Sequence, residues 1–295
     1  MIKNIVIDGN NLMYRAYHKF KTKSRKGIDS SAAYGFPYIL RSLINQQKAD
    51  KVLVVFDGKK DKNRLAIHPG YKGTRGAKKK ARDFDQEQFI SQQGDIKKML
   101  KALGVPVIHK SNREADDLMW LYTRKAKRKG EAVVIVSTDK DFNQLLSPNI
   151  SIWHPWKNKR ITHKNLINVY GYTPEQCVDY LSLVGDKSDN IEGKKGFGDK
   201  TTLKFIKEYG SLLKYIRGAG EEMNKFTRSE AKELYNMNRA LIDLRFFART
   251  YLKGEKINIK SSGKIDRKEL AIICSKYDIS TFTDDSFIKT FKNLK

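Results

Sequence analysis

Short apolar runs in the first 160 or so residues constrain the fold more than any other feature of this sequence. Four runs, all rich in β-branched residues, lie at residues 4–7, 52–56, 105–108 and 132–136. Runs of this length and composition are typical of strands buried on both faces of a parallel sheet. Segments with apolar residues at helical spacing lie between them, at 31–47, 86–103 and 114–129. The alternation predicts an α/β fold, doubly wound.

From about residue 162 onward the strand pattern gives way to helices. Thr173, with Pro174 next and Gln176 three residues on, is a capping box that predicts a helix start. Thr227 and Glu230 form a second capping box, and the helix that it opens is predicted to run to about residue 247. A further helix is predicted over 266–277. We therefore expect an α/β core over 1–165 and a helical region over 166–295.

The net charge of the chain indicates which kind of molecule it binds. The sequence has 59 Lys and Arg against 33 Asp and Glu, a formal net charge of +26. Such a charge predicts a polyanionic partner, most often nucleic acid, while a solubilising surface and an anionic membrane are the alternatives. Residues 59–82 concentrate ten of the positive charges and only one acid. An irregular segment of this length inside a compact domain is usually functional or disordered.

Two observations bear on the compartment. No uncharged apolar run approaches the roughly 18 residues of a membrane-spanning helix, so no membrane association is expected. The apolar stretch at the start is too short for a signal peptide, and two cysteines form no disulfide framework. We therefore expect a cytoplasmic protein.

Carboxylates stand where three of the predicted strands end. Asp8 and Asp57 directly follow strand residues, and Asp139 with Asp141 comes just after a third strand. The carboxyl ends of parallel strands line the ligand crevice of such a sheet. Glu114, Asp116 and Asp117 begin a helix at the same edge, where acids also suit the helix dipole. Asp186 and Asp189 follow a helix end, where acids oppose the dipole, so helix stability does not explain them.

Nine carboxylates on one rim would repel strongly. At 4 Å and an effective dielectric near 20, each like-charge pair costs roughly 4 kcal/mol, so cations are expected among them unless several are protonated. Oxygen ligands without His or Cys favour Mg²⁺, Mn²⁺ or Ca²⁺ over Zn²⁺. Two such ions a few Å apart are the arrangement that supports phosphodiester cleavage. A basic chain with its acids in one place therefore indicates a metal-dependent nuclease.

The motifs that carry this pattern resemble those of a known family. They are IVIDGNNLMYRAY at 5–17, VVFDG at 54–58, GYKGTR at 70–75, READDL at 113–118, STDKDFNQLL at 137–146 and GDKSDNIEGKKGFGDKTT at 185–202. In this order they resemble the 5′-nuclease family of flap endonucleases and 5′–3′ exonucleases, most of all its stand-alone bacteriophage members, and also the 5′-nuclease domain of bacterial DNA polymerase I. The resemblance implies a PIN-like parallel-sheet core, a helical arch over 59–84, and a helix–hairpin–helix near 175–209.

The resemblance also implies a metal site and a reaction. The implied metal ligands are Asp8, Asp57, Glu114, Asp116, Asp117, Asp139, Asp141, Asp186 and Asp189. One group would use the first four, and a second group would use Asp139, Asp141, Asp186 and Asp189, with Asp139 and Asp141 counted as catalytic. Two or more Mg²⁺ ions are implied, with Mn²⁺ as a substitute. Lys72 and Arg75 match basic residues that act near the scissile phosphate.

Other residues are implied to contact DNA. They are Arg15, Tyr71, Lys72, Arg75, Gly193, Lys195, Gly196, Gly198 and Lys200. Tyr71 would stack on an unpaired base, and the glycines would let the hairpin backbone approach duplex phosphates, with K⁺ as a candidate ion there. Glu192 and Lys194 depart from the family pattern, which commonly has Pro and an apolar residue at these positions.

The substrate implied is DNA with a 5′ single-stranded flap or end and adjoining duplex, with an RNA–DNA hybrid as an option. We expect a monomer, with any replicative polymerase or single-strand-binding partner on a separate chain. Three alternatives stay open. A non-catalytic DNA-binding protein would share the fold, a haloacid-dehalogenase-like phosphatase has an Asp-x-Asp motif like Asp139-Lys140-Asp141, and a PIN-type ribonuclease shares the acidic rim.

Overall fold

The computed structural model describes residues 2–73, 86–255, 257, 259 and 263–294. Its frame is a six-stranded sheet in the order β3-β2-β1-β4-β5-β6. The strands are β1 (Lys3–Asp8), β2 (Lys51–Phe56), β3 (Val107–His109), β4 (Ala132–Val136), β5 (Ile150–His154) and β6 (Lys159–Ile161). The first five are parallel and β6 runs antiparallel beside β5. The predicted parallel sheet is confirmed, and β5 and β6 extend it beyond the four predicted strands.

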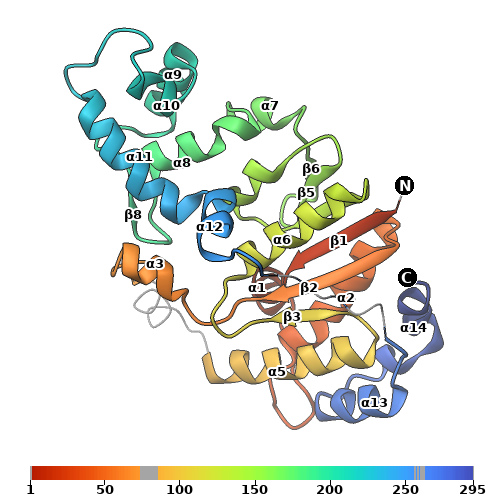
Figure 1. Cartoon of the computed structure of the whole chain (residues 1–295). Coiled ribbons are helices and arrows are strands. Elements are labelled where there is room, and N and C mark those ends of the chain that lie inside the picture. The colour runs from red at the N-terminus through yellow and green to blue at the C-terminus, as the bar shows by residue number, and fades with distance from the viewer. Residues whose placement is uncertain (1, 74–85, 256, 258, 260–262, 295) are drawn as a thin grey trace.

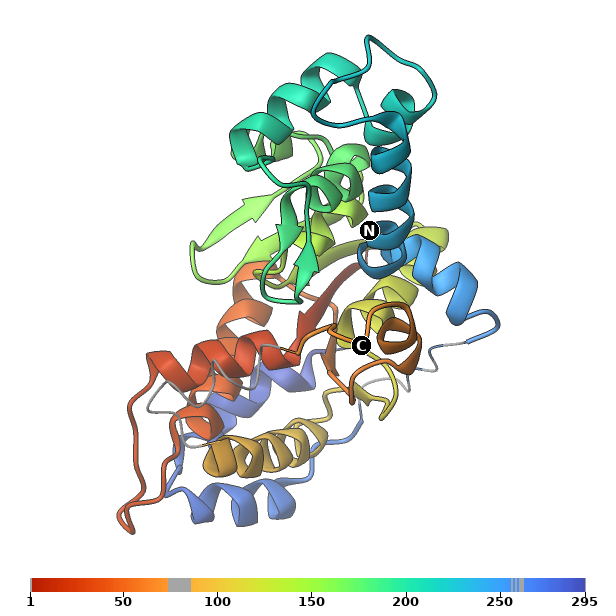
Figure 2. The ribbon, with the colours of Figure 1, turned by 90° about the vertical axis from the view of Figure 1, so that its left-hand side faces the viewer.

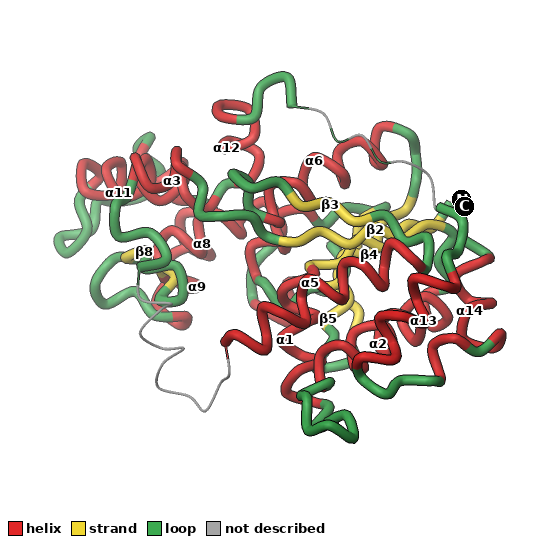
Figure 3. The backbone as a smooth tube through the Cα atoms, turned by 90° about the horizontal axis from the view of Figure 1, so that it is seen from below, coloured by secondary structure: helices red, strands yellow, loops and turns green. Residues whose placement is uncertain are grey.

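Helices cover both faces of the sheet (Figure 3). The helices on one face are α1 (Gly9–Lys19), α2 (Ser31–Gln47), α5 (Gln86–Ala102), α13 (Arg267–Lys276) and α14 (Asp285–Lys292). The other face carries α6 (Ala115–Arg128) and α12 (Leu244–Tyr251). Successive strand residues point to opposite faces, so Ile5 and Ile7 join the first core and Val6 joins the second.

The remaining helices gather at one end of the molecule (Figures 1 and 2). In chain order they are α7 (Leu166–Tyr170), the short 3₁₀ helix η2 (Pro174–Gln176), α8 (Cys177–Val184), α9 (Asp199–Tyr209), α10 (Leu212–Ile216) and α11 (Arg228–Ile242). Between α8 and α9 lies a two-stranded hairpin, β7 (Gly185–Asp186) and β8 (Ile191–Glu192). Both predicted capping boxes are present, at Thr173 with Gln176 and at Thr227 with Glu230.

Three short elements complete the described chain. They are α3 (Lys62–Ile67) and the 3₁₀ helices η1 (Lys140–Leu145) and η3 (Thr281–Thr283). The part of the predicted arch from residue 74 to 84, with Arg75, lies outside the described residues. Among the helices that are described, none has the length and apolar character needed to cross a bilayer.

The helix predicted from Thr227 to about residue 247 is wrong in its length. The chain leaves the helical conformation at Asp243, whose backbone is extended (φ −75°, ψ 97°). The Asp243 carboxylate then accepts a hydrogen bond from the Phe246 amide and so caps a separate helix, α12. The apolar residues on both sides of Asp243 made the two helices look continuous in the sequence.

The last two helices lie away from the helical end of the molecule. Helix α13 packs on α5, and α14 packs on α2. Leu270, Phe287 and Phe291 are buried in the same core as Ile5 and Ile7. The described C-terminal residues are thus part of the layer that covers the sheet.

Candidate active site

Three aspartates at the carboxyl edge of the sheet each cap a helix, and this fixes where their carboxylates lie. Asp8 ends β1 and accepts from the Asn11 amide at 3.0 Å, which caps α1. Asp57 follows β2 and accepts from the Ala115 amide at 2.8 Å, at the start of α6. Asp139 follows β4 and accepts from the Asp141 amide at 2.9 Å, which caps η1. The strand ends and helix starts therefore bring these carboxylates together at the carboxyl edge of the sheet, as the sequence predicts.

A cavity of about 170 Å³ lies at this edge. Its lining comprises Asp8, Asn10, Asn11, Asp57, Lys72, Ala115, Asp116, Asp139 and Phe142. Four of the nine predicted acids therefore face one cavity, and they come from three strand ends and the first turn of α6. We call this the acidic cavity.

Lys72 places a cation inside the acidic cavity. Its ammonium Nζ lies 2.7 Å from Glu114 Oε2 and 3.6 Å from Asp189 Oδ2. The residue has φ 53°, a left-handed conformation that is uncommon outside glycine and indicates that the surrounding contacts hold the turn. Three predicted residues that lie far apart in the sequence therefore meet here.

The β7–β8 hairpin brings Asp189 to the same place, and Asp186 lies on the same hairpin, at the end of β7. The Lys72 amide donates to the Asp189 carbonyl at 2.8 Å, and Asn190 Nδ2 donates to the Gly70 carbonyl at 3.0 Å. Ser188 donates from its amide to Asp186 at 2.6 Å and from its hydroxyl to Asp189 at 3.2 Å. These contacts join the loop from the helical end to the turn that holds Lys72.

The electrostatics of the acidic cavity are those of a site short of positive charge. Burial, and then the charge of Asp57, raise the pKa of Asp8 to about 7. Burial and the charge of Asp139, followed by those of Asp116, Asp189 and Asp186, raise the pKa of Asp141 well above its usual value. Enclosure and nearby acids also raise the pKa of Asp139, although solvent reaches this side chain and screens the effect. Cations bound among these carboxylates would relieve the repulsion.

The donor atoms suit a hard divalent cation. All predicted ligands are carboxylate oxygens, and Asn11, which lines the cavity, adds a buried Oδ1 that has no hydrogen-bond partner in the described part of the chain. In that same part, no three His, Cys, Asp or Glu side chains already converge tightly enough to hold one ion. The residues therefore fit the chemistry of a metal site. Their carboxylates line the cavity and do not form one tight cluster.

The segment from Gly193 to Lys200, which we call the glycine clamp, follows the β7–β8 hairpin. A Cβ atom on Gly193 would lie 2.3 Å from the Leu183 carbonyl oxygen, and Gly196 has φ +85°, so both positions require glycine. Gly198 caps α9, and Lys195, Gly196, Gly198 and Lys200 are exposed. Exposed amides at a helix start and two exposed lysines suit a phosphate.

Comparison with known proteins agrees with this geometry. A family model for the 5′–3′ exonuclease N-terminal resolvase-like domain matches residues 3–171, and one for the 5′–3′ exonuclease C-terminal SAM fold matches residues 172–264. The chain belongs to the 5′–3′ exonuclease family. Family membership makes it a nuclease of the hydrolase class, and decides against the phosphatase and the non-catalytic DNA-binding protein.

Individual relatives of this exonuclease differ in how much of their length they share with it. The 5′–3′ exonuclease of Aquifex aeolicus is 33% identical over 230 residues, which are 78% of this chain and 77% of the relative. DNA polymerase I of Thermus aquaticus is 38% identical over 210 residues, which are 70% of this chain and 24% of the relative. The chain thus spans about a quarter of this polymerase.

Solved structures show the same fold. The bacteriophage T5 flap endonuclease, crystallised with DNA and metal ions, has a TM-score of 0.72 at 23% identity over 98% of this chain and 99% of that one. A T5 5′-exonuclease structure with bound zinc has a TM-score of 0.71 at 23% identity and covers 99% of both chains. The expected 5′-nuclease architecture, a parallel-sheet core followed by a helical region, is confirmed.

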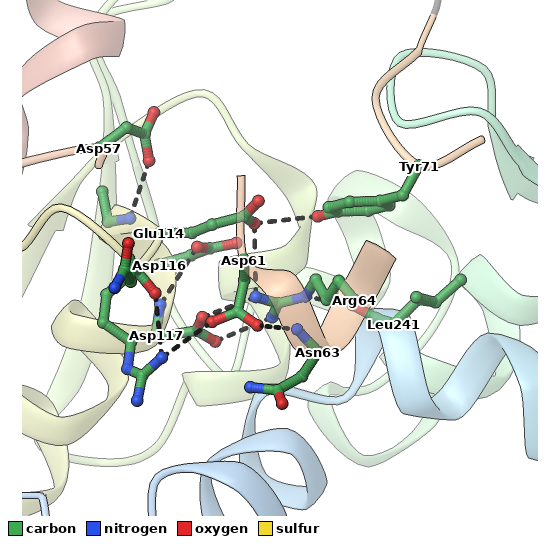
Figure 4. A network of polar contacts seen from close by, with 12 residues as sticks. Asp57, Asp61, Asn63, Arg64, Tyr71, Glu114, Asp116, Asp117 and Leu241 are labelled. Carbon is green, nitrogen blue, oxygen red and sulfur yellow. Dashed lines mark hydrogen bonds and ion pairs between the residues drawn. The ribbon is translucent and has the colours of Figure 1, made fainter. Parts of the chain in front are cut away.

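Asp117 does not take the position predicted for it in this exonuclease. It is completely buried, and both its oxygens accept from Arg64, at 2.6 and 2.8 Å (Figure 4). It follows Asp116 by one residue, and on a helix this step turns the side chain by about 100° from the cavity. The carboxylate is occupied by a guanidinium, so its prediction as a metal ligand is not supported.

Tyr71 also differs from its prediction. Its side chain is 2% exposed, so its ring has no free face for a DNA base. Its hydroxyl donates to Glu114 Oε2 at 2.9 Å and lies 3.2 Å from Asp189 Oδ2. Tyr71 therefore orients two of the predicted ligands, a role that a position between glycine and lysine in the sequence does not reveal.

Arg15 and the clamp lysine Lys194 have partners within the protein. The Arg15 guanidinium lies 5.4 Å from the ring centre of Trp156, an aromatic residue that is half exposed. Lys194 pairs with Glu230 at 3.1 Å and lies over the Phe226 ring. The Lys194 ammonium is thus held by a carboxylate and the face of an aromatic ring, which explains how a cation is accommodated where the family commonly has an apolar residue.

Sequence reasoning missed Asn10, Asn11 and Arg64. The two asparagines follow Asp8 and Gly9 directly, so their place in the first turn of α1 was a usable signal. Arg64 had no such signal, because a single arginine in a basic segment looks like a surface residue.

Proposed function

We propose that the protein is a structure-specific 5′ nuclease that hydrolyses DNA phosphodiesters at 5′ flaps, nicks or branches with Mg²⁺. The observation that carries this proposal is the acidic cavity, which concentrates carboxylates at the sheet edge of a chain with net charge +26. A basic surface attracts a polyanion, and an acidic cavity holds the cations that its phosphates need. Membership of the 5′–3′ exonuclease family supports the reaction class.

The proposed ligands are divided between two groups. Asp8, Asp57, Glu114 and Asp116 would form one, and Asp139, Asp141, Asp186 and Asp189 the other. When bound, the two ions stabilise charge on the attacking and the leaving oxygen of the phosphodiester. Lys72 lines the cavity, which supports a role for its ammonium as a donor to a phosphate oxygen there. We assign Arg75 the same role. Mn²⁺ would substitute for Mg²⁺ because it accepts the same oxygen ligands.

The glycine clamp is proposed to hold the duplex next to the cut. Gly193, Gly196 and Gly198 would let the backbone approach a phosphate, Lys195 and Lys200 would pair with it, and K⁺ would bind at the same hairpin. Residues 59–84 would form the arch for the 5′ single strand, with Arg15 nearby. We place this activity in a cytoplasmic monomer with a 1–165 core and a 166–295 helical region, of which the last helices, α13 and α14, pack on the core. It would act on DNA or RNA–DNA hybrids beside a separate polymerase or single-strand-binding protein.

Replacement of Asp139 by Asn tests the metal assignment. Asn caps a helix about as well as Asp, so η1 should persist while the cavity loses a charge. We expect Mg²⁺-dependent cleavage of a 5′-labelled flap substrate to be abolished, while DNA binding measured in Ca²⁺ stays within about threefold, since the phosphate contacts remain.

The matched control is Asp266→Asn. Asp266 also caps a helix, α13, by accepting from the Glu269 amide at 3.0 Å, but it lies outside the acidic cavity. This variant should cleave at the wild-type rate. Full cleavage by Asp139→Asn would contradict the assignment. The cleavage products of the wild-type protein on nicked, hairpin and RNA-primed duplexes would report the balance of exonuclease to endonuclease activity.

A further inference from the structure

Arg64 is a completely buried arginine near the acidic cavity. It lies on α3, the short helix that precedes the turn with Tyr71 and Lys72. Arginine is almost never fully buried without partners, because removing its charge from water costs several kcal/mol. A chain that keeps it there must gain something from its contacts.

Those contacts join three other helices (Figure 4). The guanidinium donates to both oxygens of Asp117 on α6, at 2.6 and 2.8 Å. Its Nε lies 3.3 Å from the Leu241 carbonyl near the end of α11. The group also lies 3.7 Å from the ring centre of Phe247 on α12. Arg64 therefore connects the helix at the base of the proposed arch with the sheet layer and the helical end.

The same guanidinium bears directly on the acidic cavity. Its Nη1 lies 3.4 Å from Glu114 Oε2. Its partner Asp117 lies in the first turn of α6, and the Asp117 amide donates to Asp116 Oδ1 at 3.1 Å. Glu114 and Asp116 are both proposed metal ligands. A shift of the Arg64–Asp117 pair would therefore move the helix turn that carries them.

We propose that Arg64 is a positioning residue, which acts through its pair with Asp117 to hold Glu114 and Asp116 in the geometry that binds divalent cations. This inference rests on the proposed function of the acidic cavity. It assigns Asp117 to the support of the site. The planar fork of arginine makes two parallel bonds to one carboxylate, which lysine cannot reproduce.

A role in stability alone is the alternative, and energetics separate the two. Buried ion pairs add little to stability, and well-packed apolar replacements are often neutral or stabilising. If the pair serves only to fill space between the helices, a variant with an apolar pair of similar volume would fold and cleave like the wild type. If it orients Glu114 and Asp116, apolar side chains restore the fold and leave the site impaired.

The first experiment replaces Arg64 by Lys, which keeps the charge and removes the fork. We expect kcat for flap cleavage in Mg²⁺ to fall about 10- to 100-fold, the usual effect of losing a group that orients a ligand, with KM little changed. Mn²⁺ affinity, measured by calorimetry without DNA, should fall about tenfold. Wild-type kcat and Mn²⁺ affinity in this variant would overturn the proposal.

Two double variants sharpen the test. In Arg64→Lys with Asp117→Asn, the loss of kcat should not exceed that of the more damaging single variant, because both changes break one pair. Losses that multiply would mean that Asp117 acts independently of Arg64, which contradicts the proposal. Arg64→Met with Asp117→Leu should melt near the wild-type temperature and stay impaired in kcat and Mn²⁺ affinity. Wild-type kcat and wild-type Mn²⁺ affinity in this double variant would mean that the pair contributes to stability alone.

The matched control is Arg113→Lys. Arg113 also lies between two acids beside α3, since it pairs with Asp61 at 3.1 Å and Glu255 at 2.8 Å. It precedes Glu114 in the chain, but in the described structure its guanidinium forms no ion pair with Glu114 or Asp117. This variant should keep wild-type kcat and Mn²⁺ affinity. If the wild-type protein cleaves no flap substrate, the proposed function fails. The Mn²⁺ affinities still test Arg64 by themselves, because that measurement needs no reaction.

Discussion

Tyr71 and Lys72 show how neighbouring residues take different parts in one site. Lys72 reaches into the acidic cavity, and Tyr71 is buried with its hydroxyl on Glu114. Replacement of Tyr71 by Phe keeps the ring and removes only this hydroxyl. We expect flap cleavage to fall about tenfold or more, because Glu114 and Asp189 lose an orienting donor, and the free energy of unfolding to fall by about 1 kcal/mol. A base-stacking residue would tolerate the change, so wild-type cleavage would restore the stacking role.

Tyr122→Phe is the control at the same scale. Tyr122 is also a buried tyrosine, and its hydroxyl donates to Asn4 Oδ1 at 3.1 Å. Asn4 lies near the start of β1, and Asp8 is at the opposite end of this strand. This variant should lose a similar amount of stability, about 1 kcal/mol, with cleavage unchanged. Activity measured per folded molecule, with thermal unfolding alongside, separates the two effects.

At the scale of an element, the glycine clamp presents cations of two kinds. Lys195 and Lys200 are exposed, whereas Lys194 pairs with Glu230. Replacement of Lys195 and Lys200 by Gln should weaken duplex binding and lower the slope of log affinity against log salt by about 0.9 for each DNA phosphate that the variant no longer neutralises. Lys194→Gln is the control and should change this slope less. Fluorescence anisotropy in Ca²⁺ over a salt series measures both, and equal slopes in all variants would contradict the clamp.

At the scale of the whole molecule, the C-terminal helices complete the layer over the sheet. Helices α13 and α14 bury Leu270, Ile288 and Phe291 against the core of β1 and α2. A chain truncated after residue 264 would expose the core that these side chains cover, and burial of each is worth about 1.5–3 kcal/mol. The loss is comparable with the roughly 5–15 kcal/mol that stabilises a typical domain, so we expect thermal unfolding far below the wild-type temperature.

A second truncation, after residue 292, leaves α14 intact and should melt near the wild-type temperature. If the longer truncation also left the melting temperature unchanged, the helices would be an appendage with no part in the core. Calorimetry on both chains, with flap cleavage as a second readout, tells these outcomes apart.

The sequence by itself determined four of the six strands of the sheet and the acids at its edge. Apolar runs such as 52–56 are suited to strands buried on both faces. Asp8, Asp57 and Asp139 come at or just after the ends of such runs, so local pattern and chain order suffice to place these acids at one edge of the sheet. The capping boxes at Thr173 and Thr227 were equally local. The break at Asp243 was not, because apolar residues on both sides hid a residue that caps the next helix.

Only the tertiary structure decided what the residues around the acids do. Whether Asp117 binds a cation or Arg64, and whether Tyr71 meets a base or Glu114, depends on which side chains from distant segments reach the same space. Those interactions join residues 43 and 53 positions apart. The free energy of burying a charge depends on the partner that a distant segment supplies, and no local pattern records that partner.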